Sequence, residues 1–496
     1  MINLSSFIDF HAGRTPERLA IIFNEARISY ATLARRVAIT AGWLTERGIG
    51  ARDVVAVLMK NSAAFVEIAI AVGHVGAVFL PINFRLSADE VRYIVEDAGA
   101  KLLIADEELA GAAALAGAVL LLDAAAQADS TRAGPAAAPA PRVVRKPGDL
   151  FRLMYTSGTT DRPKGVMHSY ENFYWKCSDH ILALGLGAEN RLLVTGPLYH
   201  VGAFDLPGLA VLWMGGMLCI QRDFSAEAAL AAIARERLDS AWLAPVMTSA
   251  MLVAAPASGL DLSSLRWVIG GGERTPEARI RSFTASFPNA RYIDAYGLTE
   301  TCSGDTLMEA GREIEKIGSV GRALAHVEIA IRDEQGRALP AGETGEICLR
   351  GPKITRGYWN DPAKTEAAFH GDWFRSGDMG YLDKDGFLFL TDRLKDMIIS
   401  GGENIASSEV ERVIFELPQV REVAVIGAPD ERWGEKPVAF VVLEPGAELS
   451  LETLTRHCRA KLAAFKAPRE IVIRESLPRN PSGKILKRLL RDEIRS

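Results

Sequence analysis

The chain has 496 residues, more than one hydrophobic core usually serves, so two or more domains are expected. Hydrophobic residues make up 48% and charged residues 24% of the chain, which is typical of globular proteins. The formal net charge is −5 and no Lys/Arg-rich tract occurs, so no nucleic-acid partner is expected.

Cysteine, histidine and apolar patterns exclude further classes. The five cysteines form no CxxC pair and the eight histidines no HExxH motif, so neither a disulfide framework nor a transition-metal site is expected. The N-terminus lacks the pattern of a secretory signal, and the longest apolar run, 109–122, is too short to span a bilayer. These patterns predict a cytoplasmic protein without a membrane span and leave a homo-oligomer open.

The first part of the chain alternates strands and helices, which predicts a parallel sheet covered on both faces. The expected elements are a hairpin at 19–29, strands at 54–58, 78–80, 102–105 and 118–122, and helices at 30–47, 65–75 and after a capping box at Ser87–Glu90. Residues 124–148 are rich in Ala, Pro and Gly and predict a loose surface connection.

The alternation resumes after residue 165 and then changes character. The expected strands are 192–195, 217–221, 240–243, 267–269 and 291–295, and the expected helices are 226–236, 246–254 and 276–287. Short strands and Gly turns at 327–390 predict a β-rich subdomain. The last segment mixes strands at 423–426, 438–443 and 471–474 with helices at 451–464 and after a capping box at Ser408–Glu411. We predict an α/β protein whose large N-terminal domain, 1–394, has parallel βαβ sheets and whose small α+β C-terminal domain is 395–496.

The segment Tyr155–Gly165 reads YTSGTTDRPKG and follows an apolar approach at 150–154. Small hydroxyls, unhindered backbone N–H groups and a lysine charge can wrap a polyphosphate. It is not a Walker loop, because Pro163 precedes Lys164 and a glycine follows it. A surface turn is the alternative. The candidate ligands in this phosphate loop are Thr156, Ser157, Gly158, Thr159, Thr160 and Lys164.

Further motifs follow in a fixed order along the chain. They are Gly270–Glu273 and Tyr296–Glu300, each after an expected strand, then Trp373–Asp378, Asp392–Asp396, Gly401–Asn404 and Pro481–Ile485. Taken singly, each also fits an ordinary role, such as a tight turn, a helix cap or a basic tail. In this order they resemble the acyl-adenylate-forming superfamily of acyl-CoA synthetases, peptide-synthetase adenylation domains and beetle luciferases. The resemblance covers essentially the whole chain and implies that the small C-terminal domain is mobile.

The resemblance implies a nucleoside site. Tyr296, in one motif with Gly297, is expected to stack on adenine. Asp378 would accept hydrogen bonds from both ribose hydroxyls, and Arg393 would add donors.

The resemblance also implies a phosphate and magnesium site. Gly271 and Gly272 would let the nucleotide and the acyl group pass close to the backbone. Thr299 would offer its hydroxyl to the α-phosphate, and Glu300 would ligate Mg²⁺, which takes one or two carboxylates plus phosphate oxygens and water. The phosphate loop would hold the β- and γ-phosphates.

The remaining implied roles concern two half-reactions at one site. Lys484 matches the catalytic lysine, which would bridge the substrate carboxylate and ATP, and Lys395 matches the hinge on which the small domain rotates. Gly402 and Glu403 lie in a loop that would help form the pantetheine tunnel. His200 matches a position bordering the acyl pocket; a satisfied core histidine is the alternative.

The activity so implied is an ATP-dependent carboxylic acid–CoA ligase that forms acyl-AMP and then transfers the acyl group to CoA, with ATP, Mg²⁺ and CoA required. The acyl pocket is expected among Tyr199–Asp205, Leu243–Met247, Gly270–Glu273 and Cys302–Leu307. These segments are mostly apolar or small, which favours a medium-chain fatty or aryl acid. Asp205 and Asp305 could recognise a hydroxyl or amine, although structural roles are favoured.

Three alternatives stay open: an enzyme that loads a separate carrier protein, a luciferase-like oxygenase and a degenerate nucleotide-binding protein. The sequence departs from the superfamily at one point, because Asp161 stands where the phosphate loop usually has glycine. Asp tolerates left-handed backbone better than most residues, but a carboxylate beside polyphosphate is unfavourable.

Overall fold

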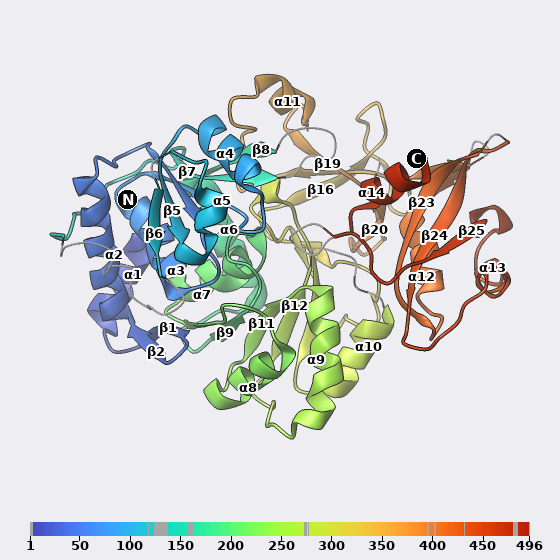
Figure 1. The fold of residues 1–496 in the computed structure, drawn as a ribbon, viewed down its shortest axis with the longest axis horizontal. Helices are drawn as coiled ribbons and strands as arrows, with labels where there is room; N and C mark the ends of the chain where they lie inside the picture. The colour runs from blue at the N-terminus through green and yellow to red at the C-terminus, as the bar shows by residue number, and fades with distance from the viewer. Residues whose placement is uncertain are drawn as a thin grey trace.

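The architecture is taken from a computed structural model of the chain (Figure 1). The structure describes residues 3–117, 119–123, 137–156, 163–271, 275, 277–393, 396–400, 403–430, 432–479 and 485–495. The described residues form four sheets, and each lies wholly on one side of residue 394. Within these ranges, no helix has the length and apolar character needed to cross a membrane.

The first sheet has six strands in the order β6-β5-β3-β4-β7-β8. Their bounds are β3 (Val54–Leu58), β4 (Val78–Pro81), β5 (Ala100–Asp106), β6 (Val119–Leu122), β7 (Leu150–Thr156) and β8 (Lys164–Ser169). All pairs are parallel except the last, in which β7 and β8 form an antiparallel hairpin around the phosphate loop. The capping box at Ser87 and Glu90 is confirmed, and it opens α4 (Ala88–Asp97).

The second sheet has nine strands in the order β15-β14-β13-β12-β11-β9-β10-β1-β2. Their bounds are β1 (Leu19–Phe23), β2 (Ala26–Ser29), β9 (Arg191–Val194), β10 (Met217–Ile220), β11 (Ser240–Leu243), β12 (Trp267–Gly270), β13 (Arg291–Tyr296), β14 (Thr306–Leu307) and β15 (Arg322–Ala323). In the sheet order from β13 to β1, each strand is parallel to its neighbour, as predicted, whereas β2 pairs antiparallel with β1.

Helices cover the faces of these two sheets. On one face of the second sheet lie α8 (Ala226–Glu236), α9 (Pro245–Ser258) and α10 (Glu277–Ser286) (Figure 1). Between the sheets, α3 (Ala63–His74) contacts both β1 and β4, and every one of its residues is buried. The other described helices here include α1 (Ser5–Arg14), α2 (Tyr30–Glu46), α5 (Ala110–Ala113), α6 (Tyr170–Leu184) and α7 (Leu209–Trp213). One continuous hydrophobic core therefore joins the two halves.

The expected β-rich subdomain is an antiparallel sheet of five strands. They are β16 (Glu328–Arg332), β17 (Gly345–Arg350), β18 (Phe369–His370), β19 (Trp373–Leu382) and β20 (Leu388–Arg393), with α11 (Pro362–Ala367) on the connection before β18. The strand β20 leads toward the C-terminal elements at the right of Figure 1.

The C-terminal segment folds around its own five-stranded sheet. It contains β21 (Ile398–Ser400), β22 (Glu403–Ile405), α12 (Ser407–Ile414), β23 (Val420–Asp430), β24 (Gly434–Leu443), α13 (Leu451–Arg459), β25 (Glu470–Ile473) and α14 (Lys487–Arg495). Among the described residues, α12 contacts β20, and two side-chain contacts reach across to the rest of the chain. The Arg279 guanidinium carbon lies 5.7 Å from the Phe415 ring centroid, and the Ser408 hydroxyl donates to the Thr391 carbonyl.

Two local predictions in this segment are wrong. The capping box at Ser408–Glu411 does not form, because the Ser408 hydroxyl bonds Thr391 and the Glu411 carboxylate accepts from the Val425 N–H at 2.7 Å. The helix expected at 451–464 ends at Arg459. The α-helix does not continue, a short 3₁₀ turn forms at Ala464–Lys466, and Leu462 and Phe465 pack against the small core.

Candidate active site

The predicted nucleotide motifs lie at the carboxyl ends of neighbouring parallel strands. Gly270 ends β12 and Tyr296 ends β13, so Gly271 and Gly297 follow the sheet edge directly. Ligands of parallel α/β sheets bind at this edge, where loops rather than strands supply the contacts. The sequence prediction that these two motifs directly follow strands is confirmed.

A hydrogen bond joins two of the predicted motifs. The Tyr296 O–H donates to the Asp378 carboxylate at 2.9 Å, although the residues are 82 positions apart. Burial, together with the neighbouring Asp378 charge, raises the pKa of Tyr296 well above its ordinary value, so the phenol keeps its proton. Asp378 on β19 faces Arg393 on β20 in the sheet register. The pairing of Tyr296 with Asp378 was not predicted from the sequence.

Glu300 is held by a tyrosine that sequence reasoning missed. The Tyr358 O–H donates to the Glu300 carboxylate at 3.0 Å, and the Lys164 ammonium lies 5.0 Å from the Tyr358 ring centroid. Burial raises the pKa of Glu300, and the Lys164 charge opposes that rise. The only sequence signal for Tyr358 was an aromatic residue in a turn-rich segment.

The donor set at Glu300 fits magnesium. Glu300 supplies one carboxylate, and one or two carboxylates are what Mg²⁺ takes alongside phosphate oxygens and water. Among the described residues no group of three His, Cys, Asp or Glu side chains could enclose a metal by itself. The remaining ligands would therefore come from ATP and water.

A buried charged network contacts the backbone of Thr299 through His168. The His168 Nε2–H donates to the Thr299 carbonyl at 2.7 Å, while His168 Nδ1 accepts from the Arg152 guanidinium at 2.9 and 3.0 Å. Burial, and after it the Arg152 charge, lowers the pKa of His168 to about 3, so this tautomer is neutral. Arg152 in turn lies 2.8 Å from Asp205, whose backbone carbonyl accepts from Lys176 at 3.0 Å.

Sequence reasoning did not identify this network. Arg152 lies within the apolar approach at 150–154. A charged residue in a strand gives no sign in the sequence of its distant partner, so its pairing could not be predicted. Asp205 and Asp305 are both fully buried, and Asp305 pairs with Lys353 at 2.9 Å. Both carboxylates are thus held by charged partners of the chain, as the favoured structural roles require.

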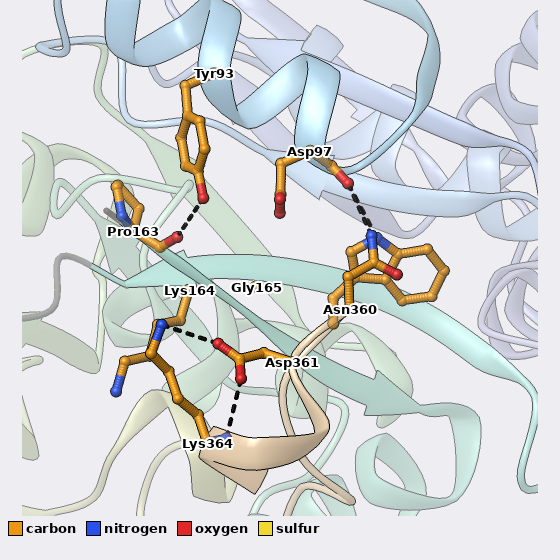
Figure 2. A pocket seen from close by; sticks show the side chains of 9 residues that line it. Tyr93, Asp97, Pro163, Lys164, Gly165, Asn360, Asp361 and Lys364 are labelled. Carbon is orange, nitrogen blue, oxygen red and sulfur yellow. Dashed lines mark hydrogen bonds and ion pairs between the residues drawn. The ribbon is translucent and has the colours of Figure 1, made fainter. Parts of the chain in front are cut away.

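The two ends of the phosphate loop are fixed by the sheet. Thr156 ends β7 and Lys164 begins β8, and the two are cross-strand partners. Lys164 also lines a cavity of about 320 Å³ beside the loop (Figure 2). The other lining residues are Tyr93, Asp97, Pro163, Gly165, Trp359, Asn360, Asp361 and Lys364. The cavity carries charges of both signs and so has no evident preference for an anion.

The predicted acyl side is built around an irregular helix, η3 (Val201–Gly208), whose residues are all buried. His200 precedes this helix, and its Nδ1 accepts from the Gly202 N–H at 3.3 Å. The imidazole therefore has a structural bond, and its place beside an acyl pocket stays a prediction.

The structure brings together seven of the predicted residues, and others lie elsewhere. Those at or near the sheet edge are Lys164, Gly271, Tyr296, Gly297, Thr299, Glu300 and Asp378. Glu403 lies exposed on β22 of the C-terminal sheet. The predicted Ser157, Gly158, Thr159, Thr160, Gly272, Lys395, Gly402 and Lys484, and the Arg393 side chain, lie outside the described residues.

Comparison with known proteins gives matches along the whole chain. The model for AMP-binding enzymes matches residues 8–359, and the model for the AMP-binding enzyme C-terminal domain matches residues 409–484. A feruloyl-CoA synthase of an Amycolatopsis species is 37% identical over 477 residues, which are 96% of each chain. The long-chain-fatty-acid–CoA ligase FadD13 of Mycobacterium tuberculosis is also 37% identical, over 95% of this chain and 93% of the relative.

Solved structures agree with these matches. The o-succinylbenzoate CoA synthetase of Bacillus subtilis, in complex with its acyl-adenylate intermediate, superposes with a TM-score of 0.89 at 31% identity, covering 99% of this chain and 98% of that one. The same synthetase has been solved with ATP and a magnesium ion, with a TM-score of 0.88 to this chain.

Proposed function

The chain belongs to the family of AMP-binding enzymes, and on that premise we propose that it ligates a carboxylic acid to coenzyme A through an acyl-AMP intermediate. ATP, Mg²⁺ and CoA are the required partners of the acid. The observation that carries this proposal is the hydrogen bond between Tyr296 and Asp378, with Thr299 and Glu300 on the adjoining turn. The bond unites the expected adenine and ribose positions in one site.

In the first half-reaction a carboxylate oxygen attacks the α-phosphorus of ATP, and the bond to pyrophosphate breaks. Thr299 and Lys164 bind phosphate oxygens, and Glu300 would hold Mg²⁺, which supplies positive charge to those oxygens when bound. Tyr296 and Asp378 hold the adenosine so that the α-phosphate faces the acid. The His168 bond to the Thr299 backbone keeps that turn in place.

In the second half-reaction the CoA thiol displaces AMP from the acyl-AMP. We assign the catalytic charge of the first step to Lys484 and the hinge to Lys395, with Gly402 and Glu403 facing the site for the second step. The division into domains 1–394 and 395–496 belongs to this proposal. Its support is that none of the sheets formed by the described residues crosses residue 394, so the C-terminal segment can rotate as a unit.

The acid itself is proposed from relatives and pocket chemistry together. The relatives act, by their names, on ferulate, long-chain fatty acids, indoleacetate and succinylbenzoate. The pocket segments of this chain are mostly apolar or small, and they favour an aryl acid or a fatty acid of limited length.

A pyrophosphate-release screen tests the proposal. Fatty, aryl and hydroxy acids are each supplied with MgATP, with and without CoA. Release that depends on the acid and rises strongly with CoA supports the ligase. Release that ignores CoA but rises with an acyl carrier protein would replace CoA by a carrier, and absence of release with every acid would overturn the proposal.

A further inference from the structure

Two glycines on the acyl side lie directly against the indole of Trp242. A β-carbon at Gly196 would come within 2.7 Å of the Cε3 and Cζ3 atoms of that ring, and one at Gly202 within 2.7–2.9 Å of Cζ2, Cε2 and Cη2. Real side chains essentially never approach this closely, so both positions need glycine while the ring stays where it is. The six-membered ring therefore fills the space that two ordinary side chains would take.

The other edge of the indole points toward the nucleotide side. The Trp242 Nε1 atom is 3.9 Å from the position of a β-carbon on Gly271, and the Ala295 carbonyl is 3.5 Å from that same position. Trp242 lies near the carboxyl end of β11, beside Ile269 in the register, and is only 7% exposed. Its ring thus extends from the segment after His200 to the turn that follows β12.

The segments expected to line the acyl pocket carry two buried ion pairs. Asp205 pairs with Arg152, and Asp305 pairs with Lys353; all four side chains are at most 2% exposed. The segment 302–307 also lies directly against η3, because a β-carbon at Gly304 would come within 3.1 Å of the Leu206 Cδ1 atom, which leaves no open path for an alkyl chain at this point. The His180 imidazole also lies directly against the segment 302–307, because a β-carbon at Gly304 would lie 2.5 Å from its Nε2 atom.

We propose that Trp242 determines the acyl specificity of this enzyme. Its indole forms a wall that admits compact acids, with an aromatic ring or a short chain next to the carboxylate, and excludes long unbranched chains. This inference rests on the proposed ligase function and narrows it, since a fatty acid of medium length is then a poor substrate. A flat aromatic wall also stacks well on an aryl ring.

The test compares acid profiles of the wild type, Trp242→Ala and a matched control, Trp43→Ala. Trp43 is 8% exposed and belongs to the same core, but it lies on α2 at the far left of Figure 1, with Arg47 over its ring at 4.0 Å. The value of kcat/KM is measured for straight-chain acids of increasing length and for substituted benzoates and cinnamates. Trp242→Phe is included as a milder change.

The expected wild-type kcat/KM for dodecanoate is roughly 100-fold below that for the best aryl or short-chain acid. Trp242→Ala should raise the ratio of kcat/KM for long acids to kcat/KM for compact acids at least about tenfold. Trp242→Phe should raise this ratio less, and Trp43→Ala should keep the wild-type ratio. An active wild type that prefers dodecanoate overturns this inference but leaves the ligase function intact. An unchanged ratio of long to compact acids in Trp242→Ala overturns the inference too. If the alanine variant does not fold, an unchanged ratio in Trp242→Phe overturns it. A wild type inactive on every acid overturns the ligase function as well.

Discussion

Tyr358 links the expected magnesium ligand to the phosphate loop, because its hydroxyl donates to Glu300 and its ring lies beside the Lys164 ammonium. A hydrogen bond to a charged group contributes about 1.5–3 kcal/mol. We therefore expect Tyr358→Phe to raise the apparent KM for Mg²⁺ by roughly tenfold in pyrophosphate release, while the unfolding midpoint stays close to that of the wild type. An unchanged Mg²⁺ requirement would remove Tyr358 from the site.

The same residues predict a pH dependence. Burial raises the pKa of Glu300, and the protonated carboxyl cannot ligate Mg²⁺. The apparent KM for Mg²⁺ should therefore rise as the pH falls through that raised pKa. Tyr358→Phe removes a bond that favours the carboxylate, so in this variant the rise should begin at higher pH. Coincident pH profiles of the two enzymes would contradict this reading.

At the scale of elements, β7, β8, α6 and η3 are locked together by one buried charged network. Arg152, His168, Lys176 and Asp205 are each at most 1% exposed. Removing one partner of a buried pair leaves an uncompensated charge, which costs about 3–5 kcal/mol. Asp205→Asn should lower the free energy of unfolding by roughly that amount.

Asp89→Asn is the matched control for this change. Asp89 pairs with Arg92 at 2.8 Å on an exposed helix face, where ion pairs contribute about 0–1 kcal/mol. Urea titrations followed by circular dichroism compare the two variants. Equal effects on the unfolding midpoint would contradict the structural role of the network.

The expected strands of the two parallel sheets lie within two residues of those observed, because a buried parallel strand is a short apolar run between turns. The capping box at Ser87 could be predicted because all its bonds are local. The one expected at Ser408 could not, since a distant carbonyl, Thr391, takes the serine hydroxyl. The Arg152–Asp205 pair could not be predicted either, because the two residues lie 53 positions apart in the sequence.

At the scale of the whole molecule, the proposed site needs both a large body and the C-terminal segment, whose contacts with that body include Arg279–Phe415 and Ser408–Thr391. The motif order predicted this division, because the catalytic and hinge lysines were assigned to the last hundred residues by resemblance. On this proposal, neither domain alone completes both half-reactions.

This division gives Lys484 a role in only one half-reaction. We expect Lys484→Ala to reduce formation of acyl-AMP by at least about 100-fold, since a charge that stabilises the transition state is lost. Thioester formation from supplied acyl-AMP and CoA should stay within a few fold of the wild type. Equal loss in both half-reactions would refute the assignment.

The measurement that tests the central claim most directly is a single turnover with the enzyme in excess over the acid. Enzyme, acid and MgATP are mixed without CoA, quenched and analysed for acyl-AMP; a parallel sample receives CoA before quenching. We predict acyl-AMP with an equal amount of pyrophosphate in the first sample, and acyl-CoA with AMP in the second. Acyl-CoA accompanied by ADP and phosphate, with no acyl-AMP at any time, would contradict the account.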